Sequence, residues 1–252
     1  MAKLPDPETV DPGELLRAYE SGEIDLICVL GPTASGKTRY AVELARALGK
    51  AEILSADSRQ VYAGMDIGTG KDLGEYGDVP YHLIDIVPAG MKFNIYQYQS
   101  DFADAWADVR RRGAIPILCG GSGLYIESAT RAYKFEKDNG VPVSRLPQSV
   151  YYIGTLVTRE ERVARIDRRL EERLQEGLVE EIQSLLASGI PADDLIYYGL
   201  EYKFVTQYVL GQLSYEDMVV ALGNAIHQFA KRQMTWFRGM ERDGVRIHWV
   251  RP

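Results

Sequence analysis

Residues 31–38 constrain what this chain can fold into more than any other segment. They read Gly31-Pro32-Thr33-Ala34-Ser35-Gly36-Lys37-Thr38, which is the Gly-x4-Gly-Lys-Ser/Thr phosphate loop. An apolar run at 26–30 precedes the loop, and a helical pattern at 37–48 follows it. The glycines let several backbone N–H groups face one anion, and the helix adds the positive end of its dipole. The segment therefore predicts a polyphosphate site between a buried strand and a helix, occupied by a nucleotide or by another diphosphate.

Two side chains of the loop extend this prediction. Lys37 brings a full positive charge to the phosphates, and the hydroxyl of Thr38 suits a magnesium ion. A phosphate-loop NTPase also carries a second acid at the end of a buried strand, and here only Asp85 remotely fits that position. The sequence therefore gives little support to nucleotide hydrolysis.

The composition predicts a folded globular chain without a membrane anchor. Apolar residues make up 46% of the 252 residues, which is ample for a core. No apolar stretch is long enough to cross a bilayer, and the N-terminus has no signal region, so we expect a cytoplasmic protein. The net charge of −7 argues against nucleic-acid binding over the whole surface, but it is compatible with a local basic patch.

The cysteines and histidines predict no metal site. Cys28 and Cys119 both lie in apolar runs, so we expect buried thiols rather than a disulfide or a metal pair. His82, His227 and His248 are dispersed along the chain and make no ligand pattern.

The order of apolar and helical segments predicts an α/β fold with a parallel sheet. The expected strands are 25–30, 52–55, 81–86, 115–119, 151–157 and 246–250. The expected helices are 37–48, 94–112, one that follows 120–123, 159–188 with a bend at Gly177, and 214–237. We expect an N-terminal extension at 1–24 and a single domain at 25–252, in which the polar stretch 131–150 is a loop or a shortened insertion.

We expect a carboxylate beside the phosphates. Asp57 follows the strand at 52–55, and the carboxyl ends of parallel strands meet beside the phosphate loop. Its carboxylate could bind magnesium or accept a proton from an acceptor substrate, and the alternative is a helix cap or a salt bridge. Lys71 could add charge to the phosphate site or lie on the solvated surface.

The turn at 120–123 reads Gly-Gly-Ser-Gly at the end of a strand. Glycines at such a place permit close approach of a ligand, and Ser122 offers a hydroxyl. A tight strand-to-helix turn explains the same residues equally well.

Two basic sets are candidates for anion binding. One helix carries Arg159, Arg162, Arg165, Arg168, Arg169 and Arg173. Five acids interleave with these arginines, so the set is either an ion-paired solvated face or a contact surface for a phosphate backbone. The second set is Lys231, Arg232, Arg238, Arg242 and Arg246. Only two acids lie within it, which favours a role facing an anion.

Several of these segments together resemble one enzyme family. They are the phosphate loop, Asp57-Ser58-Arg59-Gln60-Val61-Tyr62, Gly64-Met65-Asp66-Ile67-Gly68-Thr69, His82-Leu83-Ile84-Asp85, Gly120–Tyr125 and Ala230–Arg238. In this order they resemble the tRNA dimethylallyltransferases, or isopentenyl-tRNA transferases, over about 26–130 and 151–250. The resemblance implies a P-loop NTPase-like parallel sheet flanked by helices, with a reduced helical insertion.

The resemblance also implies a reaction and a site. The dimethylallyl group of dimethylallyl diphosphate would pass to N6 of adenosine 37, next to the anticodon of a tRNA, with Asp57 as general base and Mg²⁺ at Thr38. The implied catalytic set is Asp57, Lys37, Thr38 and Ser122. The implied diphosphate-binding set is Gly31, Thr33, Ala34, Ser35, Gly36, Lys37 and Thr38. The set implied for the adenosine and the tRNA is Asp57, Ser58, Arg59, Gln60, Lys203, Arg232 and Arg238. The enzyme would act as a monomer on a tRNA anticodon stem-loop, without a membrane.

The sequence departs from the family pattern at three places. The helical insertion that usually follows the Gly120–Tyr125 segment is reduced to 131–150, so its tRNA contacts are missing. The usual Gly-Tyr-Lys/Arg-Glu segment reads Gly199-Leu200-Glu201-Tyr202-Lys203-Phe204. Ser122 stands where the family usually has threonine.

Other functions stay open at this point. The short insertion favours transfer to free AMP, ADP or ATP, as in the cytokinin-forming enzymes, whereas the residues around Asp57 and the 231–238 segment favour tRNA. A phosphate-loop kinase would need a base pocket and a phosphate acceptor, and no residue identifies either. Asp57 and the intact loop argue against a nucleotide-binding module without catalysis.

Overall fold

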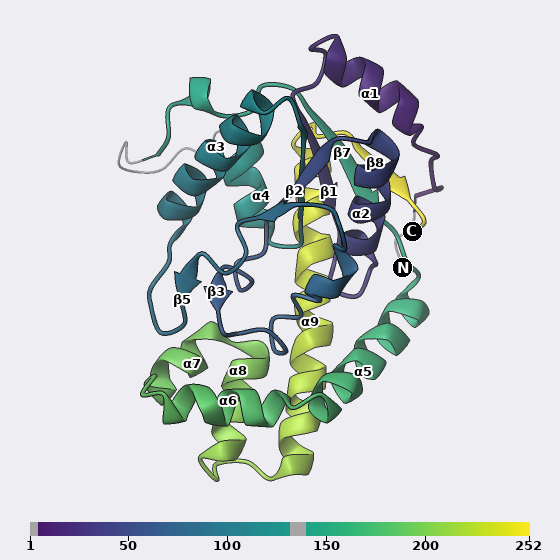
Figure 1. Cartoon of the computed structure of the whole chain (residues 1–252). Coiled ribbons are helices and arrows are strands. Elements are labelled where there is room, and N and C mark those ends of the chain that lie inside the picture. The colour runs from purple at the N-terminus through teal and green to yellow at the C-terminus, as the bar shows by residue number, and fades with distance from the viewer. Residues whose placement is uncertain (1–4, 132–139) are drawn as a thin grey trace.

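The computed structural model describes residues 5–131 and 140–252 and contains a six-stranded parallel sheet (Figure 1). The strands lie in the order β4-β2-β6-β1-β7-β8. Their bounds are β1 Leu26–Leu30, β2 Ala51–Ser55, β4 Tyr81–His82, β6 Ile115–Gly120, β7 Val150–Thr155 and β8 Ile247–Val250. Every neighbouring pair runs parallel, which confirms the predicted α/β class.

The apolar strands are buried on both faces of the sheet. In β1, Leu26, Cys28 and Leu30 face one core, and Ile27 and Val29 face the other, because successive side chains alternate. The first core contains residues of α3 (Ile95–Arg111), α4 (Gly123–Thr130) and α9 (Tyr215–Arg242). The second contains residues of α1 (Pro12–Glu20) and α2 (Lys37–Leu48). Cys28 and Cys119 are free, buried thiols, as expected.

The register of the sheet brings three strand ends together. Leu30, the last residue of β1, pairs with Gly120 of β6 and with Gly154 of β7, and Ser55 of β2 pairs with Cys119. Each strand therefore releases its following loop at the same edge. The phosphate loop, the residues after β2 and the turn after β6 all begin there.

A group of helices lies beyond this edge, in the lower part of Figure 1. It contains α5 (Arg159–Gln175), α6 (Leu178–Ala187), α7 (Ala192–Tyr198), α8 (Leu200–Val209) and the first turns of α9. Thr158 caps α5, since its side chain accepts from the N–H of Glu161 and the Glu161 side chain accepts from the N–H of Thr158. The single helix expected at 159–188 is divided, because Gly177 adopts φ +104°, which no helix interior allows. The last helix continues beyond the expected end at 237 to Arg242.

The strand expected at 81–86 was wrong beyond its first two residues. Leu83 and Asp85 take positive φ values of 64° and 56°, so the chain leaves the main sheet after β4. It then forms β5 (Val87–Pro88), which pairs with β3 (Tyr62–Ala63) in a second, two-stranded sheet.

The N-terminal extension packs against the domain, and part of the insertion region is described. Within the extension, α1 contributes the buried Leu15 to the core beside α2, and the N–H of Glu8 donates to the carbonyl of Trp249. Of the predicted insertion region, 132–139 lies outside the described residues, and 143–145 forms a short 3-10 turn. Within the described ranges, no helix is long and apolar enough to cross a membrane.

Candidate active site

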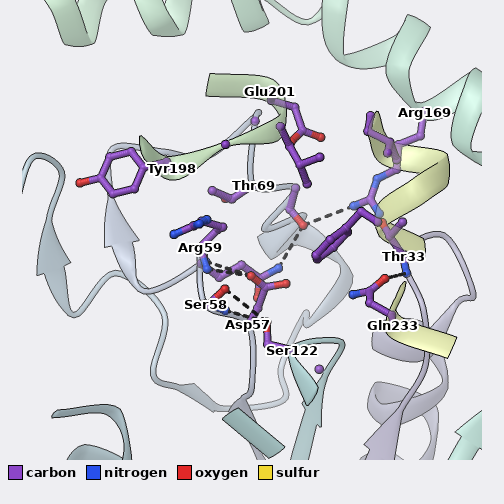
Figure 2. Close-up of a pocket in the computed structure, with 18 of the residues that line it drawn as sticks. Thr33, Asp57, Ser58, Arg59, Thr69, Ser122, Arg169, Tyr198, Glu201 and Gln233 are labelled. Carbon is purple, nitrogen blue, oxygen red and sulfur yellow. Dashed lines mark hydrogen bonds between the residues drawn. The ribbon is translucent and has the colours of Figure 1, made fainter. Parts of the chain in front are cut away.

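A cavity of about 320 Å³ lies at the sheet edge where the three loops begin (Figure 2). Among the sequence-predicted residues, it is lined by Thr33, Lys37, Thr38, Asp57, Ser58, Arg59, Gln60, Ser122 and Arg232. A second cavity of about 400 Å³ shares Lys37 and Thr38 with the first and also contacts Ala34 and Gly36. The structure thus brings the phosphate loop and the predicted carboxylate to one site.

The phosphate loop has the geometry that an anion requires. Ala34 and Gly36 adopt left-handed φ values of 59° and 82°. Gly36 caps α2 without a side-chain hydrogen bond, so the first amides of the helix remain available. Burial lowers the pKa of Lys37, while nearby Cys119 and Asp57 act in the opposite direction. A bound diphosphate would relieve the cost of burying that ammonium group.

Two residues of the predicted diphosphate-binding set are buried within the phosphate loop. Gly31 and Ser35 are buried, and neither lines the two cavities. The Ser35 hydroxyl hydrogen bonds with that of Thr155 at 2.6 Å, and Thr155 also donates to the carbonyl of Leu30. The Ser35 side chain therefore fastens the loop to β7, and only its backbone can face a phosphate.

Asp57 stabilises the loop after β2 and keeps one oxygen free. Its Oδ1 accepts from the N–H of Arg59 at 2.8 Å and of Gln60 at 3.4 Å. Asp57 makes no ion pair within the described residues, so the salt-bridge alternative is wrong. The hydroxyl of Ser122 accepts from the N–H of Ser58 at 3.1 Å, so the turn after β6 supports the same loop. Figure 2 shows Asp57, Ser58 and Ser122 side by side.

The arginines of α5 reach the phosphate site. Arg169 and Arg173 line the same cavity as Lys37 and Thr38, and Arg165 and Arg168 line the second cavity. Arg169 donates to the carbonyl of Gly70 at 3.3 Å and pairs with Asp72. The set is therefore partly ion-paired, as one alternative held, and four of its members lie beside the phosphate loop, although Arg165 and Arg168 are also exposed to solvent.

A buried ion pair lies on the wall opposite Asp57. Arg173 donates to Glu201 at 2.9 Å, and both side chains are about one-tenth exposed. Burial lowers the pKa of Arg173 and raises that of Glu201. Gly70, at φ +58°, allows this approach, because a Cβ there would lie 1.7 Å from the Arg173 guanidinium.

Lys71 neither adds charge to the phosphate site nor lies on the solvated surface, so both alternatives stated for it were wrong. Its ammonium group is 1% exposed and donates to the Tyr62 carbonyl at 2.8 Å and to Asp66 at 2.6 Å. It also pairs with Asp85. Because these oxygens compensate its charge, Lys71 is neither a surface lysine nor a phosphate ligand. Asp85, the candidate for the second acid of a phosphate-loop NTPase, is therefore already paired with Lys71.

The sequence did not reveal how the loop after β3 is held. Glu181 of α6 accepts from the backbone N–H groups of Asp66, Ile67 and Gly68 at 2.8, 2.7 and 3.1 Å. It also accepts from the Tyr202 hydroxyl at 2.7 Å. One carboxylate thus fixes three consecutive amides, and it lies more than a hundred residues away, so no local pattern could have indicated it.

Only some of the residues predicted to contact the adenosine and the tRNA line the cavity. The Arg59 guanidinium lies 5.7 Å from the centre of the Tyr198 ring at the rim of the cavity. The Gln60 amide is already engaged, since it donates to the carbonyl of Gly70 at 3.2 Å and accepts from Ser55. Lys203 does not line the cavity; its ammonium group lies 5.3 Å from the Phe204 ring.

Arg238 lines a separate cavity. This third cavity of about 130 Å³ lies between α9 and the end of β7 and also contacts Arg162 and Lys231. None of the three cations makes an ion pair within the described residues. Burial lowers the pKa of Arg162, and the neighbouring charges of Arg159 and Arg238 lower it further. The three side chains can therefore receive an external anion.

No side-chain cluster could hold a metal without a substrate. Across the described residues, no group of three or more histidine, cysteine or acidic side chains is arranged to bind a cation. The three histidines instead pair with carboxylates, His82 with Glu52 among them. Each histidine side chain thus has a carboxylate partner within the protein.

Comparisons with known proteins identify relatives over nearly the whole chain. The family model described as IPP transferase matches residues 60–148 and 134–240, and the isopentenyl transferase model matches 24–76. The chain is 45% identical over 285 residues to tRNA dimethylallyltransferase 2 of Bacteroides fragilis, covering 90% of this chain and 93% of the relative. It is 47% identical over 282 residues to tRNA dimethylallyltransferase 1 of Porphyromonas gingivalis, covering 89% and 93%.

Solved structures agree with these relatives. The tRNA delta(2)-isopentenylpyrophosphate transferase of Staphylococcus epidermidis superposes with a TM-score of 0.78 at 30% identity, over 90% of this chain and 92% of that one. The Bacillus halodurans tRNA isopentenylpyrophosphate transferase gives 0.78 at 29% identity, over 90% and 89%. The alignment with the Bacteroides relative has 285 positions, more than the 252 residues of this chain, so the relative contains residues that this chain lacks.

Proposed function

The chain belongs to the IPP transferase family, and we propose that it transfers the dimethylallyl group of dimethylallyl diphosphate to N6 of adenosine 37 in tRNA. One observation supports this reaction most directly. A phosphate loop with free helix amides and a carboxylate without a cation partner line the same cavity. The first suits a departing diphosphate, and the second suits an amine that must lose a proton.

The leaving group is stabilised by positive charge. When the bond between the allylic carbon and oxygen breaks, its electron pair remains on the diphosphate. Lys37, the α2 amides and the guanidinium groups of Arg169 and Arg173 surround the place where this charge develops. Such preorganised donors act strongly because they need no rearrangement during the reaction.

The nucleophile is activated from the other side. The N6 lone pair is delocalised into the adenine ring, so the amine attacks weakly. As the new N–C bond forms, the free oxygen of Asp57 accepts the N6 proton. The turn that Asp57 makes with Arg59 and Gln60 holds this carboxylate in place.

The donor set fits Mg²⁺ bound mainly by substrate. The Thr38 hydroxyl lines both cavities and makes no hydrogen bond within the described residues. Mg²⁺ keeps several waters and commonly uses one or two protein oxygens together with substrate phosphates. Thr38 would hold the ion against the diphosphate, where its charge would weaken the bond to the leaving group.

The acceptor is best tested by offering the two candidate acceptors in separate reactions. Purified protein is given labelled dimethylallyl diphosphate together with an unmodified anticodon stem-loop or, separately, AMP. Label in the RNA supports the proposal, and label in AMP supports the cytokinin-forming alternative. Label in neither, with ATP consumed instead, would indicate a kinase.

The third cavity offers a contact for the RNA backbone. Arg238→Ala should weaken stem-loop binding and reduce the slope of log affinity against log salt by about 1, because one phosphate contact is lost. Arg17→Ala removes the same charge from an exposed place on α1, outside both basic sets, and serves as control. Equal slopes for the two variants would remove Arg238 from the proposed RNA contacts.

A further inference from the structure

We propose that Gln233 is a positioning residue that fixes the phosphate loop against the turn carrying Ser122. Gln233 lies on α9 and is 7% exposed. Its Oε1 accepts from the backbone N–H of Thr33 at 2.9 Å, and its Nε2 donates to the carbonyl of Gly121 at 2.9 Å. One carboxamide therefore joins segments that are far apart in the sequence. This role rests on the proposed prenyl transfer.

The orientation of the amide is determined by its partners. A backbone N–H can only donate and a backbone carbonyl can only accept, so the oxygen must face Thr33 and the nitrogen must face Gly121. Both contacts are buried, where an unmet polar group is costly. Gly121 permits the approach, because a Cβ there would lie 2.4 Å from the Gln233 nitrogen.

The bridge connects the two halves of the reaction site. Gly121 precedes Ser122, whose hydroxyl accepts from the N–H of Ser58 beside Asp57. The phosphate loop is therefore joined through Gln233 to the turn after β6, and through Ser122 to the loop that carries Asp57. Figure 2 shows the contact between Gln233 and Thr33. The distance between leaving diphosphate and attacking amine depends on these two loops. A displacement of about 1 Å in such a geometry can cost on the order of a hundredfold in rate.

The first experiment removes the bridge without adding charge. Gln233→Met keeps a side chain of similar length but cannot accept from Thr33 or donate to Gly121. Gln228→Met makes the same replacement at an exposed place on the same helix and is the control. We expect kcat for stem-loop prenylation to fall by about 10- to 100-fold in Gln233→Met, with the Kd of inorganic diphosphate changed by less than about threefold. A kcat within twofold of the control would overturn the proposal.

The second experiment restores the bridge with a proton. In Gln233→Glu the ionised carboxylate still accepts from Thr33 but repels the Gly121 carbonyl. Once protonated, it can donate there as the amide does, and burial beside a carbonyl raises the pKa at which this happens. The ratio of kcat for Gln233→Glu to that of wild type should therefore rise as the pH falls from about 8 to about 5.5. The ratio cancels any pH dependence that the two proteins share.

A charge effect alone gives a different pattern. If the Gln233→Glu carboxylate merely repelled diphosphate, its ratio would also rise at low pH, but neutral Gln233→Met would be as active as the control. That combination would refute the bridge. A flat ratio with a low kcat would refute it as well.

The proposal can fail separately from the prenyl-transfer assignment. Hydrogen exchange of the Thr33 amide needs no substrate, and it should be slow in wild type and clearly faster in Gln233→Met. Slow exchange in both would show that Gln233 does not hold this amide, whatever reaction the enzyme performs. Absence of transfer by wild type, with the Thr33 difference present, would refute only the reaction.

Discussion

Replacing Asp57 with asparagine should separate the two tasks of its carboxylate. Oδ1 makes the turn with the N–H groups of Arg59 and Gln60, and the other oxygen is free for the substrate. Asparagine can keep the first contacts through its amide oxygen, but it cannot take a proton. Loss of a positioned general base commonly costs about 10²–10⁴ in rate, which is about 3–5 kcal/mol in the barrier. We therefore expect Asp57→Asn to lose transfer on that scale while its Tm stays within about 2 °C of wild type.

Asp57→Ala provides the contrast, because it removes the turn as well. Two hydrogen bonds at about 1 kcal/mol each predict a Tm lower by about 4 °C, in addition to the loss of activity. Single-turnover transfer to the stem-loop measures the chemical step, and calorimetry with inorganic diphosphate measures phosphate binding, which both variants should keep. Asp78→Asn, at a carboxylate that is 85% exposed, serves as control. If Asp57→Asn kept more than about a tenth of the wild-type rate, the assigned base would be wrong.

Three further predictions test the surrounding charges. Lys37→Ala should raise the Kd for inorganic diphosphate by about tenfold or more, since it removes a charge-assisted contact, and unchanged affinity in calorimetry would contradict the phosphate role. Arg173→Met should destabilise the fold by about 3–5 kcal/mol in urea unfolding, because it leaves Glu201 buried without a partner, and adding Glu201→Gln should recover part of that loss. The hydrogen bond from the Arg112 guanidinium is the main reason that the pKa of Glu52 lies below its usual 4.5. The stability that this pair contributes is therefore complete above pH 4.5, and it is lost as the pH falls through the pKa of Glu52 in the folded state. Glu52→Gln should therefore lower stability at pH 7 by about 1–3 kcal/mol and flatten the dependence of Tm on pH below 4.5; an unchanged acid profile would refute this linkage.

The central part of the fold follows from local sequence. The apolar run 26–30 is β1, and the glycine pattern of 31–38 forms the turn and the exposed N-terminus of α2. The position of Asp57 followed from one topological rule, that the loops after parallel strands meet at one edge. These features were predictable because each depends on a few adjacent residues or on the order of strands.

The parts that could not be predicted depend on partners distant in the sequence. Nothing near Lys71 indicates that the chain reverses so that Asp85 reaches it. Gln233 contacts Thr33 across 200 residues, and Glu181 binds backbone amides, which carry no sequence information. The arginines of α5 had the spacing of a solvated face, and only the packing of that helix shows that Arg169 and Arg173 face the phosphate loop.

The charges that remain free suit transfer to an amine that must lose a proton. The acids that could orient a water are largely engaged, because Asp66 and Asp85 pair with Lys71 and Glu201 pairs with Arg173. Among the described residues that line the cavity of about 320 Å³, Asp57 is the carboxylate without a cation partner, and its Oδ1 is held by the N–H groups of Arg59 and Gln60. Lys37 makes no ion pair within the described residues, so its charge remains available to the phosphate, and the charge of Asp57 remains available to the acceptor. An amine that enters beside Asp57 meets the allylic carbon with its proton acceptor already in place.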